Sequence, residues 1–364
     1  MHSRSDDRGL IGGGLVLGIT FSDLRFRFRQ FLIAVAGAGL VFSMSLLMSG
    51  LANGFSYEIN QTVQGFGADA WVVAHGSAAR IAALSPLPES DVSEVAKAPG
   101  VKSATAVIVM PREATVAGRT INIALIGSQS GVPTPKDLSA GHPVNGPGQT
   151  VVDARLGAHV GERIALNGHP YLVVGTVSGR TLLGGLPDVY VNNRDAQSLA
   201  FAGAHVISAV ITKGVPHGLP PRLAVVTNQE LEQSSLAGMS TAVSSINNSK
   251  WLMWLIASVI IAALVYVTAL QRTRDFAVLK ALGCTSRKLF GGLAIQSVAI
   301  ALAASVVALI ISGFMKGVFA QPVEIPGSAY LALPLSALIV GLVASLIALR
   351  RAISVDPAAA FAGG

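Results

Sequence analysis

Residues 271–290, QRTRDFAVLKALGCTSRKLF, form a basic segment that separates two long apolar runs. The segment holds five basic residues against one acidic residue, namely Arg272, Arg274, Lys280, Arg287 and Lys288 against Asp275. Short loops of membrane proteins that carry an excess of Lys and Arg remain on the cytoplasmic side. We therefore predict that residues 271–288 form a cytoplasmic loop, and the rest of the chain can be placed relative to it.

The composition indicates a membrane protein. Of the 364 residues, 51% are hydrophobic and only 12% are charged, and the mean hydropathy is +0.59, whereas soluble domains are more polar. Residues 52–250 contain thirteen basic and thirteen acidic residues, so the net charge of +7 is carried by the remainder of the chain, beside the apolar runs. This distribution reflects membrane topology and does not favour a nucleic acid partner.

Four uncharged runs approach or exceed the roughly 20 residues needed to cross a bilayer, at 31–51, 251–270, 289–315 and 329–349. A signal peptide is the alternative for the first run, but that run is longer than the usual apolar core and lacks an A-x-A exit. Because twelve of the thirteen basic residues outside 52–250 lie on one side of the runs, both termini (1–30 and 350–364) are predicted to be cytoplasmic, with 52–250 and 316–328 outside the inner (plasma) membrane.

The N-terminal region is predicted to carry an amphipathic helix at residues 15–29 on the inner membrane surface. Leu17, Phe21, Leu24 and Phe28 recur at helical spacing, while Asp23, Arg25 and Arg27 point elsewhere. The alternative is that this stretch is only the basic flank of the first span, and the two interpretations are compatible.

Residues 52–250 are predicted to form a mixed α/β domain. Asn167-Gly168 joins two β-rich runs within residues 163–177, as a type I′ hairpin would, and Gly118 indicates a second hairpin before the strand 119–126. Similar signals predict a strand at 206–212, short helices at 89–97 and 193–201, and a surface loop at 131–148.

The segments next to the membrane, residues 53–64 and 227–250, are predicted to be helices that extend the first two spans and form a stalk. A flexible linker is the alternative for 227–250, because Ser, Asn and Gly are frequent there. The predicted fold class is an α+β membrane protein, with four transmembrane helices and a large mixed α/β extracytoplasmic domain on helical stalks.

The sequence shows no pattern typical of an enzyme. The histidines form no metal-binding spacing, no phosphate-binding lysine motif occurs, and Cys284 has no cysteine partner in the chain. The four runs lack ionisable residues, so we interpret Ser43, Ser45, Gln296 and Ser297 as hydrogen-bonding groups between helices, and the small residues around Ala34 and Gly37 as positions of close helix packing. A homodimer is the economical arrangement for so few spans.

The loop contains a motif that is similar to one in a known protein family. Residues 272–283, R-x-R-D-x-x-x-L-K-A-L-G, resemble the R-x-R-E-x-x-x-L-K-A-x-G element of FtsX/MacB-type ABC transporter permeases, with Asp275 in place of the more frequent Glu. The order of the segments and the ending Asp356-Pro357 to Phe361 are also similar to this family, and residues 151–177 resemble part of its outer domain.

This resemblance implies a homodimeric permease served by two copies of a separate ABC ATPase, which would bind the ATP and Mg, with no cofactor in this chain. It implies that the loop is a coupling helix. The residues themselves predict a helical end at Gly283, a suitable C′ residue, and an N-cap of the next helix at Thr285 or Ser286. The implied contacts with the ATPase are Arg272, Arg274, Asp275, Phe276, Leu279, Lys280, Leu282 and Gly283 in the loop, and Asp23, Arg25 and Arg27 in the N-terminal helix.

The expected function is mechanotransmission, in which ATP-driven movement of the coupling helix changes the shape of the outer domain, for export or extraction of a lipid, peptide, drug or other amphiphile. One alternative is a non-transporting regulator of cell-wall hydrolases, with an extracytoplasmic partner protein. Another is a membrane sensor without an ATPase. Co-purification with a hydrolase favours regulation, whereas stimulation of ATPase activity by an amphiphile favours export.

Overall fold

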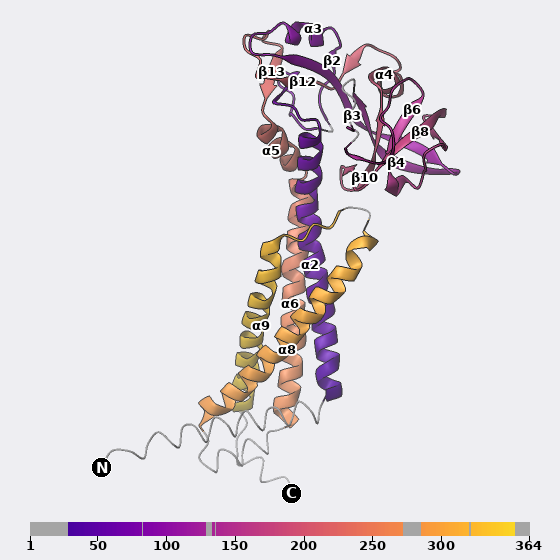
Figure 1. Ribbon diagram of the computed structural model, residues 1–364. Coiled ribbons are helices and arrows are strands. Elements are labelled where there is room, and N and C mark those ends of the chain that lie inside the picture. The colour runs from indigo at the N-terminus through magenta and orange to yellow at the C-terminus, as the bar shows by residue number, and fades with distance from the viewer. Residues whose placement is uncertain are drawn as a thin grey trace. The chain divides into compact units, whose positions relative to one another are not determined.

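The chain folds into two compact units (Figure 1). A computed structural model describes residues 28–81, 83–128, 133–134, 136–271, 285–319 and 322–353. The helical unit is drawn from Met1–Gly50, Ser245–Gly317 and Ile325–Gly364, and the sheet unit from Leu51–Ser244 and Val318–Glu324.

The helical unit is built from four long helices, which are α2 (Phe28–Gly65), α6 (Ser240–Gln271), α8 (Ser286–Met315) and α9 (Gly327–Ile353). Among the described residues, three helical stretches are long and apolar enough to cross a membrane, and they are Phe31–Gly65, Ser240–Thr268 and Ala294–Val318. A shorter apolar stretch, Gly327–Val343, lies within α9. The four apolar runs of the sequence are therefore all helical where they are described.

Close packing between these helices depends on small and polar side chains. A Cβ atom added to Gly39 of α2 would lie 2.9 Å from Cγ1 of Val307 in α8, so only glycine fits this contact without a shift. The indole Nε1 of Trp254 in α6 donates a hydrogen bond of 2.6 Å to Oγ of Ser45 in α2, which confirms the predicted bond between helices at Ser45. The same prediction for Ser43 is wrong, because its hydroxyl donates to the Leu40 carbonyl of its own helix.

The sheet unit contains thirteen strands within the described residues: β1 (Ala70–Ala74), β2 (Leu87–Pro88), β3 (Ser103–Val116), β4 (Arg119–Ser128), β5 (Leu138–Gly141), β6 (Gln149–Asp153), β7 (Arg163–Leu166), β8 (His169–Val177), β9 (Thr181–Leu182), β10 (Leu186–Val191), β11 (Val206–Ile207), β12 (Ala209–Lys213) and β13 (Leu223–Val226). The main sheet has the order β13-β1-β12-β3-β4-β10-β6-β8-β5, and β2 pairs with β11 in a separate ribbon. Since β7 pairs with both β3 and β8, the strands β3, β4, β10, β6, β8 and β7 form a closed ring.

Both predicted hairpins are confirmed. Asn167 and Gly168 have φ values of 53° and 82° between β7 and β8, as a type I′ turn requires. Ala117 and Gly118, with φ values of 47° and 78°, join β3 to β4. Two other predictions need correction, since β5 lies inside the predicted loop 131–148, and the predicted strand 206–212 is divided between two sheets at Ser208.

The short helices agree with their sequence signals. They are α3 (Asp91–Ala96), α4 (Asn193–Phe201) and α5 (Asn228–Gly238), and 3-10 turns occur at Ala154–Leu156 and Lys316–Val318. The predicted stalk segments are helical too. Residues 53–64 belong to α2, while 227–250 divides into α5 and α6 at Met239.

Alternating residues of the central strands belong to two different hydrophobic cores. On β3, Ile108 faces the core that contains α3 and α4 residues, whereas Val107 and Val109 face the core that contains the end of α2. The second core includes Ile59 and Val63 of α2, Phe66 just after its end, and Leu231 of α5. The end of α2 is thus an integral part of the sheet unit.

Candidate functional site at the end of helix α2

The predicted ATPase-contact residues lie outside the described part of the chain. They are Asp23, Arg25, Arg27, Arg272, Arg274, Asp275, Phe276, Leu279, Lys280, Leu282 and Gly283. Immediately after them, Thr285 occupies the N-cap position of α8 with extended backbone, although its side chain makes no capping hydrogen bond. The site that the structure describes is where the end of α2 joins the sheet.

An apolar contact forms the base of this junction. Ile59 and Val63 are buried against the sheet, and Phe66 meets Trp71 of β1 edge to face with ring centroids 5.3 Å apart. Trp71 is itself fixed by a hydrogen bond of 2.8 Å from its Nε1 to Oδ1 of Asn228 in α5. Burial of large side chains of this kind stabilises a fold by about 1.5–3 kcal/mol each.

A buried carboxylate of α2 adds a specific polar connection. Glu58 is 2% exposed, and its Oε1 accepts a hydrogen bond of 2.6 Å from Oγ1 of Thr181 in β9. Its Oε2 accepts a bond of 2.9 Å from the backbone N–H of Gly184, in the turn between β9 and β10. Leu183, Gly184 and Gly185 all have positive φ in that turn. The turn therefore holds a conformation suited to glycine while it binds a helix side chain.

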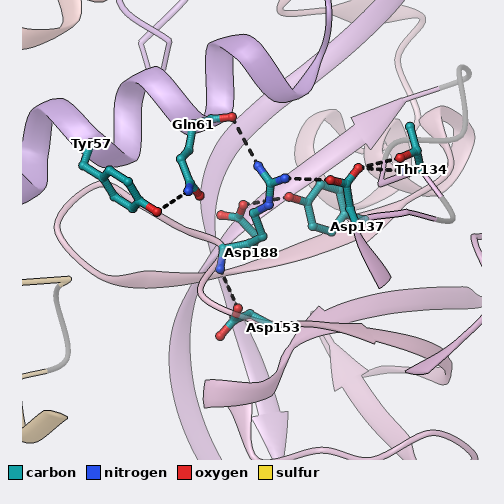
Figure 2. Close-up of polar contacts among 8 residues, drawn as sticks. Tyr57, Gln61, Thr134, Asp137, Asp153 and Asp188 are labelled. Atoms are coloured by element: carbon teal, nitrogen blue, oxygen red, sulfur yellow. Dashed lines mark hydrogen bonds and ion pairs between the residues drawn. The ribbon is translucent and has the colours of Figure 1, made fainter. Parts of the chain in front are cut away.

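Arg180, just before β9, is hydrogen-bonded to Gln61, Asp137 and Asp153, which are labelled in Figure 2. Its Nη1 donates to the Gln61 carbonyl of α2 at 3.3 Å, and its Nη2 donates to Oδ1 of Asp137 at 2.9 Å. A positive charge at the carbonyl end of a helix interacts favourably with the helix dipole. Gly65 leaves room for this side chain, since a Cβ atom there would lie 3.2 Å from Nη1. The guanidinium therefore clamps the last turn of α2.

Asp137 is held in turn by its own segment. Its Oδ2 accepts hydrogen bonds from the Oγ1 and backbone N–H of Thr134, at 2.6 and 3.1 Å. Burial raises the pKa of Asp137, but the bonds from Thr134 and the charge of Arg180 outweigh burial, so the pKa lies below its ordinary value. Asp137 is therefore ionised opposite Arg180 at neutral pH.

A second buried carboxyl lies on the next strand. Asp188 of β10 is 2% exposed, and Oη of Tyr190 donates a hydrogen bond of 2.8 Å to its Oδ2. Burial raises the pKa of Asp188 to about 7. The bond from Tyr190 lowers that pKa, and the nearby carboxylates Asp153 and Glu58 raise it. Burial also raises the pKa of Tyr190, so the phenol keeps its proton.

The opposite side of α2 is joined to α5. Asn60 and Gln64 both donate to Oε1 of Glu232, at 3.1 and 3.5 Å. The N-terminus of α5 is fixed by a capping box between Thr227 and Glu230. The end of α2 is thus fastened on one side to a helix and on the other to the β9–β10 hairpin.

Two known protein-family models match this chain. Residues 31–219 match the MacB-like periplasmic core domain, and residues 251–357 match the FtsX-like permease C-terminal domain. An uncharacterized ABC transporter permease of Mycobacterium tuberculosis, Rv2563, is 35% identical over 341 residues, which cover 94% of this chain and 98% of the relative. A second one from that organism, Rv0072, is 34% identical over 344 residues, with the same coverage.

The chain belongs to the FtsX/MacB-type family of ABC transporter permeases. It is also similar to the extracellular domain of YknZ from Gram-positive bacteria, with 19% identity and a TM-score of 0.33 over 43% of this chain and 99% of that one. The chain is similar as well to the periplasmic region of MacB from Actinobacillus actinomycetemcomitans, with 15% identity and a TM-score of 0.35 over 48% of this chain and 96% of that one. The resemblance and the α+β membrane fold class inferred from the sequence are confirmed by the family matches and the structure.

The junction residues Glu58, Arg180 and Asp188 of this permease were not predicted from the sequence. A signal was present for two of them. Glu58 is the only acidic residue in the helical segment 53–64, and Asp188 and Tyr190 stand two apart in a β-rich run, which places them on one face of a strand. No local pattern indicated Arg180, because its partners are distant in sequence.

Proposed function

We propose that this permease transmits motion from a separate ABC ATPase to its sheet unit. The supporting observation is the anchoring of α2. This one helix begins with an apolar span, and its end is held in the sheet unit by Glu58 and by the Arg180 clamp. A displacement of such a helix would be passed to the β9–β10 hairpin without first breaking a buried contact.

In this proposal the ATPase is bound by the cytoplasmic loop and by the N-terminal helix. The loop contacts are Arg272, Arg274, Asp275, Phe276, Leu279, Lys280, Leu282 and Gly283, and the helix contacts are Asp23, Arg25 and Arg27. Two ATPase subunits would bind ATP and Mg beneath a homodimer of this chain. Both termini would lie in the cytoplasm, and the sheet unit would lie outside the inner (plasma) membrane, in keeping with the basic flanks of the spans.

The substrate class that fits this arrangement is an amphiphile, such as a lipid, peptide or drug. It would be exported or extracted at the outer face of the inner (plasma) membrane. The apolar runs contain no Asp, Glu, Lys, Arg or His, and ionisable groups within the membrane usually mark pathways for ions or protons. An amphiphile that stays at the membrane surface does not need such a pathway.

The first experiment is purification of the intact chain from host membranes, followed by identification of the proteins that accompany it. We expect an ABC ATPase in the complex. Reconstituted in lipid nanodiscs, this complex should hydrolyse ATP faster when the transported amphiphile is added. A complex that contains no ATPase would contradict the proposal, and co-purification of a cell-wall hydrolase would favour the regulatory alternative.

The second experiment tests the loop. The double substitution of Arg274 and Leu279 by Ala should leave the chain folded and abolish stimulation of the ATPase, because the loop would no longer transmit its movement. Lys97→Ala, which removes an exposed base of the sheet unit, is the control and should keep full stimulation. Normal stimulation in the double variant would show that the loop is not the coupling element.

A further inference from the structure

The sheet unit buries a cluster of carboxyl groups around the β9–β10 hairpin. Glu58, Asp153 and Asp188 are each 2% exposed or less. The guanidinium of Arg180 is already engaged by Asp137, and the positive charge of Arg155 interacts with Glu58. If all three buried carboxyls were ionised, the cluster would carry a negative charge that its cations do not balance, which is costly away from water.

The three carboxyl groups differ in how well they are solvated by the protein. Both oxygens of Glu58 accept hydrogen bonds, and so do both oxygens of Asp153, whose Oδ1 accepts from the backbone N–H of Arg155 at 2.9 Å and whose Oδ2 accepts from that of Arg180 at 2.7 Å. Asp188 accepts only the bond from Tyr190, and its Oδ1 has no hydrogen-bond partner within the described residues. A proton in the cluster is therefore best placed on Asp188.

The position of Asp188 couples its charge to the anchoring of α2. Its backbone N–H donates to the Arg180 carbonyl at 3.0 Å, and the preceding residue, Pro187, pairs with Thr181. Thr181 and Arg180 are the residues that hold Glu58 and the Gln61 carbonyl of α2. The strand that carries Asp188 thus supports both connections to the helix.

We propose that Asp188 is the proton-binding group of a latch between α2 and the β9–β10 hairpin, closed when Asp188 is protonated and loosened when it is ionised. The titratable and charged groups that face the latch are Tyr190 on the same strand, Asp153 at the end of β6, Glu58 on α2, Arg180 before β9 and Asp137 before β5. Ionisation of Asp188 would add a charge repelled by Asp153 and Glu58 and would leave Oδ1 without a donor. Both effects favour entry of water and separation of the hairpin from the helix.

The direction of the pH dependence follows from burial. Burial raises the pKa of Asp188 to about 7 in the folded chain, above the value of roughly 3.9 for an unfolded Asp. Protonated Asp188 therefore contributes its full stabilisation of the folded chain below the unfolded pKa. This contribution is lost as the pH rises through the folded pKa. The latch requires no ATPase. Only the physiological role of the latch, which would make the anchoring of α2 respond to external pH, rests on the proposed function and its topology.

The test uses the intact chain in lipid nanodiscs, followed by thermal unfolding between about pH 5 and pH 8, the window in which Asp188 loses its proton. We expect the unfolding midpoint of the unchanged chain to fall as the pH rises. Asp188→Asn keeps an acceptor for Tyr190 but cannot ionise, so its midpoint should fall less and should exceed that of the unchanged chain near pH 8. Glu113→Gln, at an exposed carboxylate of β3, is the control and should behave as the unchanged chain does.

A second measurement avoids dependence on one variant. The infrared band of a protonated carboxylic acid should disappear from the unchanged chain across the same pH window. In Tyr190→Phe the loss should move to higher pH, because the hydrogen bond from Tyr190 lowers the pKa of Asp188. A role in packing alone would not move this band. Equal pH dependence in Asp188→Asn and the unchanged chain, or no acid band that titrates in this window, would overturn the latch.

Discussion

The backbone N–H of Arg180 donates a hydrogen bond of 2.7 Å to Oδ2 of Asp153, a carboxylate that is fully buried at the end of β6. Because this bond fixes the backbone of Arg180, it also aims the guanidinium that clamps α2. The other oxygen of Asp153 caps the 3-10 turn Ala154–Leu156. One carboxylate thus organises two turns of the chain.

Asp153→Ala should therefore lower stability strongly. It leaves the N–H groups of Arg155 and Arg180 without their acceptors, and a buried unsatisfied donor costs about 1–3 kcal/mol. We expect a clear fall in the unfolding midpoint of the intact chain in nanodiscs. Glu113→Ala, an exposed position, serves as the control and should leave the midpoint nearly unchanged. Similar midpoints for the two variants would show that Asp153 does not fix the turns.

Thr181→Val tests the connection between Glu58 and the hairpin. The substitution keeps the shape of the side chain and removes the hydroxyl that donates to Oε1 of Glu58. We therefore expect the free energy of unfolding to fall by about 1–3 kcal/mol. Hydrogen exchange of the segment 181–186 should also become faster, because the hairpin is released from α2. Thr120→Val, at an exposed position of β4, is the matched control. Unchanged exchange in Thr181→Val would contradict the anchoring role of the hydroxyl.

Arg112→Ala tests how the carboxyl end of α4 is held. The Nε and Nη2 atoms of Arg112 donate to the carbonyls of Leu199 and Ala200, at 3.2 and 2.7 Å. Hydrogen bonds from charged groups contribute about 1.5–3 kcal/mol, so the variant should unfold at a lower denaturant concentration. Arg119→Ala removes an exposed arginine from the partner strand of the same hairpin. The interpretation fails if both substitutions shift the midpoint equally.

Trp254→Phe tests the hydrogen bond between α6 and α2. It retains an aromatic ring and removes the N–H that donates to Ser45, and bonds of this kind between membrane helices contribute about 0.6 kcal/mol on average. A small but measurable loss of thermal stability in nanodiscs is expected. Trp251→Phe, at a neighbouring tryptophan that is 64% exposed, should have a smaller effect. The reverse order of the two effects would show that the bond to Ser45 is not stabilising.

The local features of this chain could be predicted because they depend on neighbouring residues. Apolar runs predicted the long helices, Asn167-Gly168 predicted its hairpin, and the signals at 193–201 predicted α4. Where prediction failed, distant pairing decided the outcome. β5 forms in a Pro- and Gly-rich loop because β8 offers it an edge, and the split at Ser208 follows from pairing with β2 and β3.

The sequence by itself determined the family, the apolar helices and the main hairpins of this permease, since periodicity, turn chemistry and the motif at 272–283 act over short distances. Only the tertiary structure decided which charges are buried. Glu58 and Thr181 are 123 residues apart, and the cost of burying Asp188 depends on Asp153, Glu58 and Tyr190 around it. Desolvation and long-range hydrogen bonds are properties of the packed chain, so the anchoring of α2 emerges only when the sheet is assembled around it.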